Sequence, residues 1–254
     1  MALIIREEAL KEQQVRALLD VLFPPRCRLC QRSTTGESTP WVCQPCWQTI
    51  AYMQPPFCWQ CGQPFTAPPE GIASLMHRCG TCLLSPPAYA RARAVGYYQG
   101  VLRDLIHAMK YQRVYGLVTP LGRLLQGHFS AYWQEQKPHA ILPVPLHRRK
   151  LRSREFDQAL ALASHLSQHV QIPLWVDVLR RSRPTLPQVG LNANERQRNV
   201  RGAFSVTNPT LCAGKTLLLI DDVYTTGATV QECARLLHQA GAACVEVYTL
   251  ARVR

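Results

Sequence analysis

The fold is decided by one stretch, residues 216–230, which reads TLLLIDDVYTTGATV. Its apolar start predicts a buried strand, and the helical pattern at residues 228–240, ended by Gly241, predicts a helix after the turn. Unpaired N–H groups and the dipole at a helix N-terminus favour a phosphate. We therefore expect a phosphate at the turn, and Asp221 and Asp222 to accept hydrogen bonds from the hydroxyls of an attached sugar. The turn residues are Thr225, Thr226, Gly227, Ala228 and Thr229.

Strands and helices alternate on the N-terminal side of this stretch and continue after it. The pattern predicts strands at residues 94–98, 140–146, 174–179, 215–222 and 243–253, and helices at 100–111, 116–136 and 156–170. Apolar strands separated by helices favour a mostly parallel sheet covered on both faces, an α/β fold. The chain has no GxGxxG after a strand and no GxxxxGK[ST], so dinucleotide and Walker-type sites lack their anchor residues.

Eight of the eleven cysteines form four CxxC pairs, which predict metal sites. Twelve residues separate the first two pairs and seventeen separate the last two, spacings that suit two four-thiolate zinc sites. Sequential pairing is favoured, and interleaved pairing stays open. Residues 26–87 have little apolar periodicity, so we expect two structural Zn2+ ions to stabilise them. The ligands would be Cys27, Cys30, Cys43 and Cys46 for one ion, and Cys58, Cys61, Cys79 and Cys82 for the other.

Composition narrows the class of protein. The 254 residues are 47% hydrophobic and 18% charged, which excludes a wholly disordered chain. No apolar run approaches the ~18 residues of a membrane-spanning helix. Residues 6–22 have an amphipathic helical pattern, and the first residues lack the basic start of a secretory signal, so we expect a cytoplasmic protein without membrane insertion.

Positive charge is concentrated in the C-terminal part. The net charge is +13, and residues 96–254 carry twenty Lys and Arg against ten Asp and Glu. Five cations, Arg148, Arg149, Lys150, Arg152 and Arg154, fall within seven positions. They suit a pyrophosphate, a nucleic-acid backbone or simply a solvated basic face. Lys110 either reaches a phosphate or complements the C-terminus of its helix.

The 216–230 stretch resembles the signature of type I phosphoribosyltransferases, which bind 5-phosphoribosyl 1-pyrophosphate (PRPP). Together with the CxxC pairs it resembles the ComF family of competence-associated proteins, which includes GntX-type proteins. Two further segments agree with that family: PVPLHRRKLRSREFDQA at 143–159 and QVGLNANERQRNVRGAF at 188–204. One segment departs from it, because the usual Arg-Gly-Phe-Asn-Gln is replaced by Arg154-Glu155-Phe156-Asp157-Gln158. Acids favoured in the first turn of a helix explain Glu155 and Asp157 equally well.

The resemblance implies three parts: an N-terminal helix at 1–25, a double zinc ribbon at 26–88 and a phosphoribosyltransferase-like domain at 89–254. It implies PRPP or a ribose 5-phosphate-like ligand with Mg2+, and single-stranded DNA and a competence helicase or uptake proteins as partners in DNA uptake or natural transformation. Asp221 and Asp222 would be the catalytic residues of a transferase. Pyrophosphate or DNA phosphate would contact Lys110, Arg148, Arg149, Lys150 and Arg154.

Three hypotheses of different class stay open. In the first, the chain is an enzyme that transfers phosphoribose to an unidentified acceptor. In the second, it keeps the PRPP pocket as a sensor and binds single-stranded DNA through its basic residues and zinc ribbon. In the third, Asp-Asp after a buried strand binds Mg2+ for phosphoryl transfer, which the Thr-Thr-Gly-Ala-Thr turn argues against.

Overall fold

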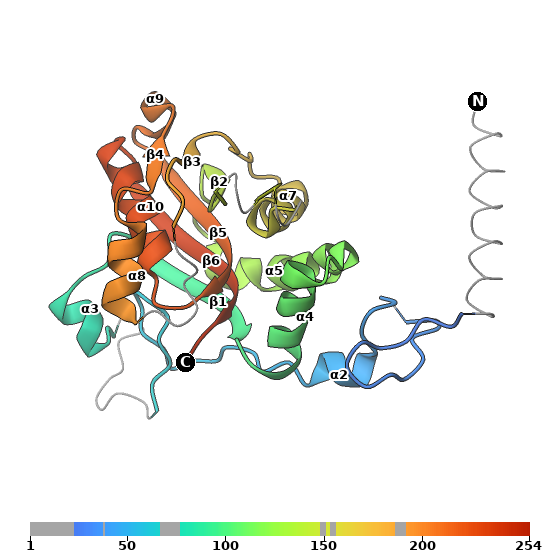
Figure 1. The fold of residues 1–254 in the computed structure, drawn as a ribbon. Helices are drawn as coiled ribbons and strands as arrows, with labels where there is room; N and C mark the ends of the chain where they lie inside the picture. Colours follow the sequence, from blue (N-terminus) through green and yellow to red (C-terminus); the bar gives the residue numbers. More distant parts are fainter. Residues whose placement is uncertain (1–22, 38, 67–76, 148–150, 153–155, 186–191) are drawn as a thin grey trace, which may run out of the picture. The chain divides into compact units, whose positions relative to one another are not determined.

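The computed structural model describes residues 23–37, 39–66, 77–147, 151–152, 156–185 and 192–254 (Figure 1). The chain divides into two compact units, residues 1–50 and residues 51–254. The helix predicted at residues 6–22 lies outside the described residues. The domain limits at residues 25 and 88 stay a prediction.

Four parallel strands form the sheet of the larger unit, in the order β1-β6-β5-β2. They are β1 (Arg91–Tyr97), β6 (Cys244–Arg252), β5 (Thr216–Tyr224) and β2 (Ala140–Pro143). Residues 217–220 of β5 are fully buried, as expected for a strand covered on both faces. The register places Tyr224 beside Arg252, so the carboxyl ends of β5 and β6 lie next to each other.

Helices cover both faces of this sheet (Figure 1). One face carries α4 (Gly100–Tyr111), α5 (Val118–Trp133) and α7 (Gln158–Val170), and the other carries α8 (Ala193–Val200) and α10 (Ala228–Gln239). From α10, Val230, Cys233 and Leu237 pack into the core that contains Leu217 and Leu219. The predicted α/β fold is confirmed.

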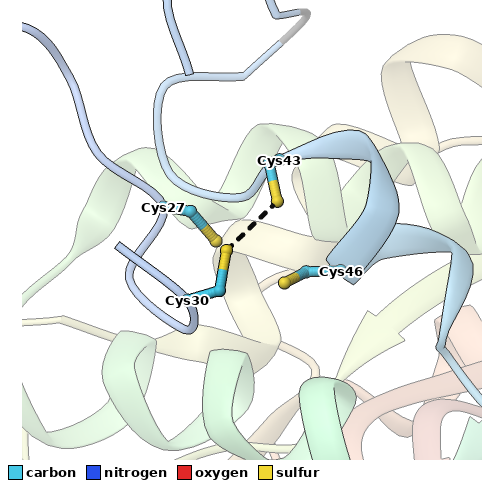
Figure 2. Close-up of side chains that lie close together, drawn as sticks. All are labelled: Cys27, Cys30, Cys43 and Cys46. Carbon is cyan, nitrogen blue, oxygen red and sulfur yellow. Dashed lines mark hydrogen bonds between the residues drawn. The ribbon is translucent and has the colours of Figure 1, made fainter. Parts of the chain in front are cut away.

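The eight paired cysteines lie in two similar ribbons. In each, a tight turn holds the first CxxC pair: the amide of Cys27 donates to Arg32 O at 2.7 Å, and that of Cys58 donates to Gln63 O at 2.7 Å. The second pair of each ribbon is carried by a short helix that begins directly after a cysteine. These helices are α2 (Gln44–Gln48), which follows Cys43, and α3 (Gly80–Leu84), which follows Cys79. Figure 2 shows the first cluster, with its four sulfur atoms directed toward one another.

The second ribbon is hydrogen-bonded to the edge of the sheet at β1. Tyr52 forms an antiparallel bridge with Gly96, and the amide of Met53 donates to Val95 O at 2.9 Å. Farther along the strand, the amide of Ala92 donates to Gln60 O at 2.6 Å. The second cysteine cluster therefore belongs to the same compact unit as the sheet.

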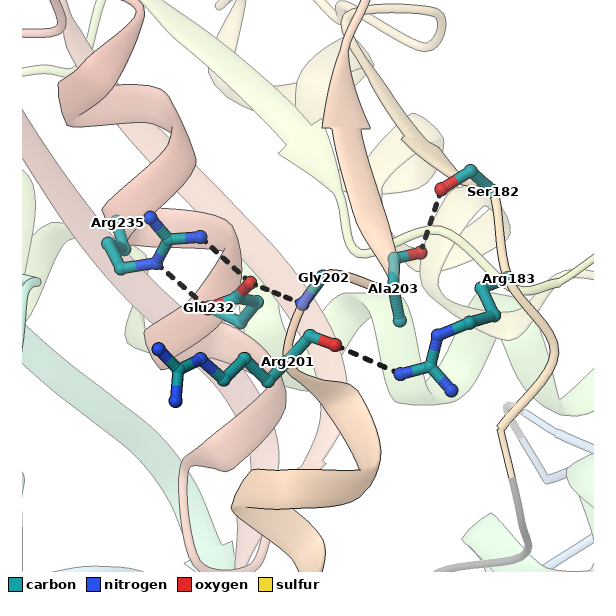
Figure 3. A network of polar contacts seen from close by, with 7 residues as sticks. All are labelled: Ser182, Arg183, Arg201, Gly202, Ala203, Glu232 and Arg235. Atoms are coloured by element: carbon teal, nitrogen blue, oxygen red, sulfur yellow. Dashed lines mark hydrogen bonds and ion pairs between the residues drawn. The ribbon is translucent and has the colours of Figure 1, made fainter.

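A small antiparallel pair, β3 (Leu179–Arg181) and β4 (Phe204–Val206), accompanies α8. Figure 3 shows how this region is connected to α10: the amide of Gly202 donates to Glu232 at 2.8 Å, and Arg235 donates two hydrogen bonds to the same carboxylate. Arg183 donates to the carbonyl of Arg201 at 2.9 Å, at the end of α8. This arginine, one of the basic residues of the C-terminal part, therefore has a structural use.

The strand predicted at residues 174–179 is wrong. Leu174 makes only a single parallel bridge with Ile141, residues 176–178 bend, and β3 begins at Leu179. The side chain of Asp177 within this segment is 85% exposed, so the chain leaves the sheet there. The predicted helix at 116–136 is a 3-10 turn, η1 (Tyr115–Leu117), followed by α5. Within the described part of the chain, every helix is too short or too polar to cross a membrane.

Candidate functional site

Both cysteine clusters fit a tetrahedral zinc ion. In each, the four sulfur atoms lie within 4.8 Å of one another, which confirms sequential pairing. Cys30 Sγ and Cys43 Sγ are 3.5 Å apart, and Cys61 Sγ and Cys79 Sγ are 3.7 Å apart. Four Zn–S bonds of about 2.3 Å in a tetrahedron place the sulfur atoms ~3.8 Å apart. A disulfide would need about 2.05 Å. The arrangement therefore supports two structural zinc sites. His77, a possible spare ligand two positions before Cys79, is not in either cluster.

The surroundings of Cys58 in the second cluster favour a thiolate at that position. The amides of Cys79 and Cys61 both donate toward Cys58 Sγ, at 3.2 and 3.5 Å. The hydrogen bond with Cys61, followed by backbone N–H groups, lowers the pKa of Cys58 to about 4 against the opposing effect of burial. Donors of this kind orient a sulfur ligand and stabilise its negative charge.

Asp221 and Asp222 stand where the sequence predicted, at the carboxyl end of β5. The amide of Asp222 donates to Asp221 Oδ1 at 2.8 Å, and Asp222 itself is buried. Loss of water around the carboxyl, reinforced by the nearby Asp222 carboxylate, raises the pKa of Asp221 to about 8. Near pH 7 the Asp221 carboxyl is therefore mostly protonated.

Lys110 lies against this pair. It comes from the last turn of α4, and its Nζ is 2.8 Å from Asp222 Oδ2, with side-chain exposures of 15% and 11%. Burial alone would lower the pKa of Lys110, but the Asp222 carboxylate raises it by charge and by hydrogen bonding. Lys110 therefore stays cationic beside the Asp222 carboxyl. The sequence left two roles open for Lys110, a phosphate contact or complementing the C-terminus of its helix; in the structure its Nζ contacts Asp222, and the phosphate contact stays a prediction.

The turn after β5 is built around Gly227. Its φ of +79° is the left-handed conformation that glycine adopts without strain, and it is the N-cap of the twelve-residue helix α10. A Cβ on Gly227 would lie 2.3 Å from the hydroxyl of Tyr224, so the turn rests directly on that side chain. Thr226 is exposed, and Thr225 and Thr229 are half-buried. The turn thus leads small residues into the N-terminus of α10, the end of a helix where N–H groups and the dipole favour an anion.

Asp157, the acid that replaces the usual asparagine of the family, is the N-cap of α7. Its Oδ1 accepts from the amide of Leu160 at 3.0 Å. Burial raises the pKa of Asp157, helped by the charge of Asp222, and hydrogen bonds from the backbone of Leu160 and Leu146 oppose the rise. Because asparagine and aspartate cap helices about equally well, the departure preserves the local structure. It also adds a third carboxyl near Asp221 and Asp222.

The structure adds contacts for three further residues: Tyr115 and Phe156, which the sequence suggested as base-stacking aromatics, and Arg181, which it suggested as part of a basic surface. The rings of Tyr115 and Phe156 lie 4.7 Å apart, and Phe156 adjoins the N-cap Asp157. Arg181 of β3 stacks on Phe204 and donates to Thr185, and its Nε is buried without a described partner. The predicted phosphate ligands Arg148, Arg149, Lys150 and Arg154, together with Glu155, lie outside the described residues, so their role stays a prediction.

Two family models match the chain: residues 18–83 match a double zinc ribbon domain, and residues 157–254 match a phosphoribosyl transferase domain. The chain is similar to the DNA utilization protein YhgH of Escherichia coli (strain K12), with 34% identity over 230 residues, 89% of each chain. It is similar to Competence protein F of Haemophilus influenzae, with 31% identity over 91% of this chain and 98% of the relative. Competence protein ComFC of Bacillus subtilis (strain 168) is 25% identical over 83% of this chain and 84% of its own length.

Some solved structures are similar to this chain at low identity. The adenine phosphoribosyltransferase of Saccharomyces cerevisiae is 16% identical, with a TM-score of 0.37 over 56% of this chain and 72% of its own. The match of residues 157–254 to the phosphoribosyl transferase domain and the parallel sheet agree on the same architecture.

Proposed function

Since the chain belongs to the family of the DNA utilization protein YhgH and Competence protein F, we propose that it binds PRPP with Mg2+ in the turn after β5. The observation that carries this proposal is the sequence of groups along β5 and α10. Two carboxyls end the strand, and a glycine with φ of +79° then brings the turn to the start of a helix. PRPP likewise carries its ribose hydroxyls and its 5-phosphate side by side, so the two carboxyls would face the hydroxyls and the start of the helix would face the phosphate.

Each group has a chemical role in the proposed complex. The amides of the turn and the start of α10 would bind the 5-phosphate. Asp221 and Asp222 would accept hydrogen bonds from the ribose hydroxyls. Lys110 would leave Asp222 and contact the pyrophosphate instead. Bound Mg2+ would neutralise charge on the pyrophosphate. The cations that the sequence predicts to contact phosphate would help to neutralise the pyrophosphate as well. They are Arg148, Arg149, Lys150 and Arg154.

Calorimetry with Mg2+–PRPP tests this proposal. We expect the double variant Asp221→Asn, Asp222→Asn to lose ribose recognition, and Thr229→Ala to weaken phosphate binding. Asp104→Asn is the matched control, because Asp104 is a partly exposed acid on α4 paired only with Arg103 in the described contacts. Equal affinity in all four proteins contradicts the proposal.

Single-stranded DNA is the second ligand that we propose, in the context of DNA utilization that the names of the relatives give. The charge of residues 96–254, with twenty basic against ten acidic residues, attracts a phosphate backbone. Such binding weakens steeply with salt because counterions are released. Competition between PRPP and DNA would indicate shared cations, independent binding would indicate a separate groove, and no binding at low salt contradicts this part of the proposal.

A cytoplasmic location belongs to the same proposal, because a reducing compartment keeps eight zinc-binding thiols reduced.

A transferase activity on a nucleobase-like acceptor is the alternative, and the aromatic pair Tyr115 and Phe156 favours it. Rings beside a ribose site can stack a planar base. Attack of the acceptor on the anomeric carbon would then displace pyrophosphate, with one carboxyl of the Asp pair able to move a proton. Pyrophosphate release with candidate bases distinguishes turnover from binding alone.

A further inference from the structure

Arg252 at the end of β6 is a buried cation with an unusual set of partners. It is 6% exposed, and no ion pair joins it to a carboxylate among the described residues. Its Nη1 donates to Cys61 O at 2.6 Å, and its Nη2 donates to Gln63 Oε1 at 2.8 Å. The same Nη2 lies 3.9 Å from Cys61 Sγ, a sulfur of the second cluster. The guanidinium therefore faces a sulfur atom of the second cluster rather than an acid.

The other face of Arg252 rests on Tyr224. The guanidinium carbon lies 4.2 Å from the centre of that ring, and the Tyr224 hydroxyl is 2.6 Å from the hydroxyl of Tyr89. The same Tyr224 side chain packs against Gly227, because a Cβ added to Gly227 would lie 2.3 Å from the Tyr224 hydroxyl. One continuous set of contacts thus runs from Cys61 through Arg252 and Tyr224 to the turn of the proposed PRPP site.

The acceptors of Arg252 explain why this set of contacts depends on the metal. Both oxygens that accept from its guanidinium belong to the turn that holds Cys58 and Cys61: Cys61 is itself a member of the second cluster, and Gln63 lies two positions beyond it. A zinc ion held by the four sulfur atoms would fix this turn and, with it, the position of both acceptors. Without zinc the turn would lose that anchor, and Arg252 would be a buried cation whose hydrogen-bond acceptors are no longer held in place. The guanidinium would then move away from Tyr224 toward water.

We propose that Arg252 is a positioning residue through which the zinc ion of the second cluster sets the conformation of residues 225–229. The consequence for ligand affinity rests on the proposed PRPP site, but the coupling itself concerns the chain alone. The first cluster lies in the other compact unit and provides the internal comparison. Zinc at Cys58, Cys61, Cys79 and Cys82 is accordingly part of the phosphate site's construction as well as of the ribbon's stability.

Hydrogen exchange on the full-length, zinc-loaded protein without ligand tests the coupling. The variants are Arg252→Met, which keeps the length of the side chain and removes its charge, Arg252→Lys, which keeps the charge, and Cys46→Ser, which disables the first cluster. Zinc content and thermal unfolding are measured on each. We expect Arg252→Met to keep zinc in its second cluster. Its amides at residues 225–230 should exchange at least about tenfold faster than those of the wild type, because loss of one charged hydrogen bond changes the opening equilibrium by about that factor. Arg252→Lys should recover part of the protection, and Cys46→Ser should match the wild type at these amides.

A second arm keeps the test decisive if Arg252→Met fails to fold. Tyr224→Phe leaves the cluster and Arg252 intact and removes only the hydroxyl beneath Gly227, so it should accelerate exchange at 225–230 without zinc loss. Unchanged exchange in Arg252→Met or, where that variant is unfolded, in Tyr224→Phe overturns the proposal. Equal acceleration in Cys46→Ser also overturns it, because the effect would then not be specific to the second cluster. Mg2+–PRPP affinity is measured on the same proteins. Wild-type protein that binds no PRPP refutes the proposed function, while the exchange rates still decide the coupling.

Discussion

Binding of PRPP should release a proton from Asp221. Loss of water and the neighbouring Asp222 raise the pKa of Asp221 to about 8 in the free protein. A ribose hydroxyl donates its hydrogen bond to a carboxylate, so the proposed complex requires the ionised form. Because the free protein holds a proton that the complex gives up, affinity should increase as pH rises through 8.

The size of the effect follows from that pKa. At pH 7 a group with a pKa of about 8 is protonated in roughly ten molecules of eleven, so binding should release about 0.9 proton. The dissociation constant should then fall about fivefold between pH 7 and pH 8 and less than about twofold between pH 8 and pH 9.

Calorimetry in buffers of different ionisation enthalpy measures the released proton directly. The phosphate of the ligand itself ionises near pH 6, so the measurements belong at pH 7 and above. Asp221→Asn provides the control, because any release that remains in this variant belongs to the ligand or to other residues. Release of less than about 0.3 proton at pH 7 by wild-type protein that binds PRPP would refute the role given to Asp221.

Three other changes test the local structure. Asp157→Asn should keep the cap of α7, whereas Asp157→Ala should lower the free energy of unfolding by about 1 kcal/mol in urea titrations; equal stability of the two variants contradicts the cap. Gly227→Ala should weaken PRPP binding more than Gly202→Ala, which has positive φ and open space, since only the former clashes with Tyr224. Asp221→Asn should stabilise the free protein more at pH 8 than at pH 5: a carboxyl whose pKa is raised on folding contributes stability at low pH and loses it as pH rises through 8. A stability difference that does not change with pH would contradict the raised pKa.

The sequence predicted the parts of the site that follow one another along the chain. An apolar run, two acids and a small turn before a helix were enough to predict β5, the start of α10 and the place of Asp221 and Asp222. The CxxC spacings predicted both cysteine clusters, and the four-sulfur groups of the structure decided between sequential and interleaved pairing.

The remaining parts depend on contacts between distant residues. Cys61 and Arg252 are 191 positions apart, and only the register of β5 with β6 puts Arg252 against Tyr224. The pairing of Lys110 with Asp222 similarly needs α4 folded against the end of the sheet. The strand predicted at residues 174–179 was wrong because the apolar composition of this segment does not indicate the bend at residues 176–178.

The most direct test of the central claim is a crystal structure of the full-length protein with Mg2+–PRPP. We predict the 5-phosphate at the amides of Thr225–Thr229, the ribose hydroxyls on Asp221 and Asp222, and Lys110 released from Asp222. A PRPP molecule bound anywhere else, with the Lys110–Asp222 pair intact and the turn after β5 empty, would contradict the account.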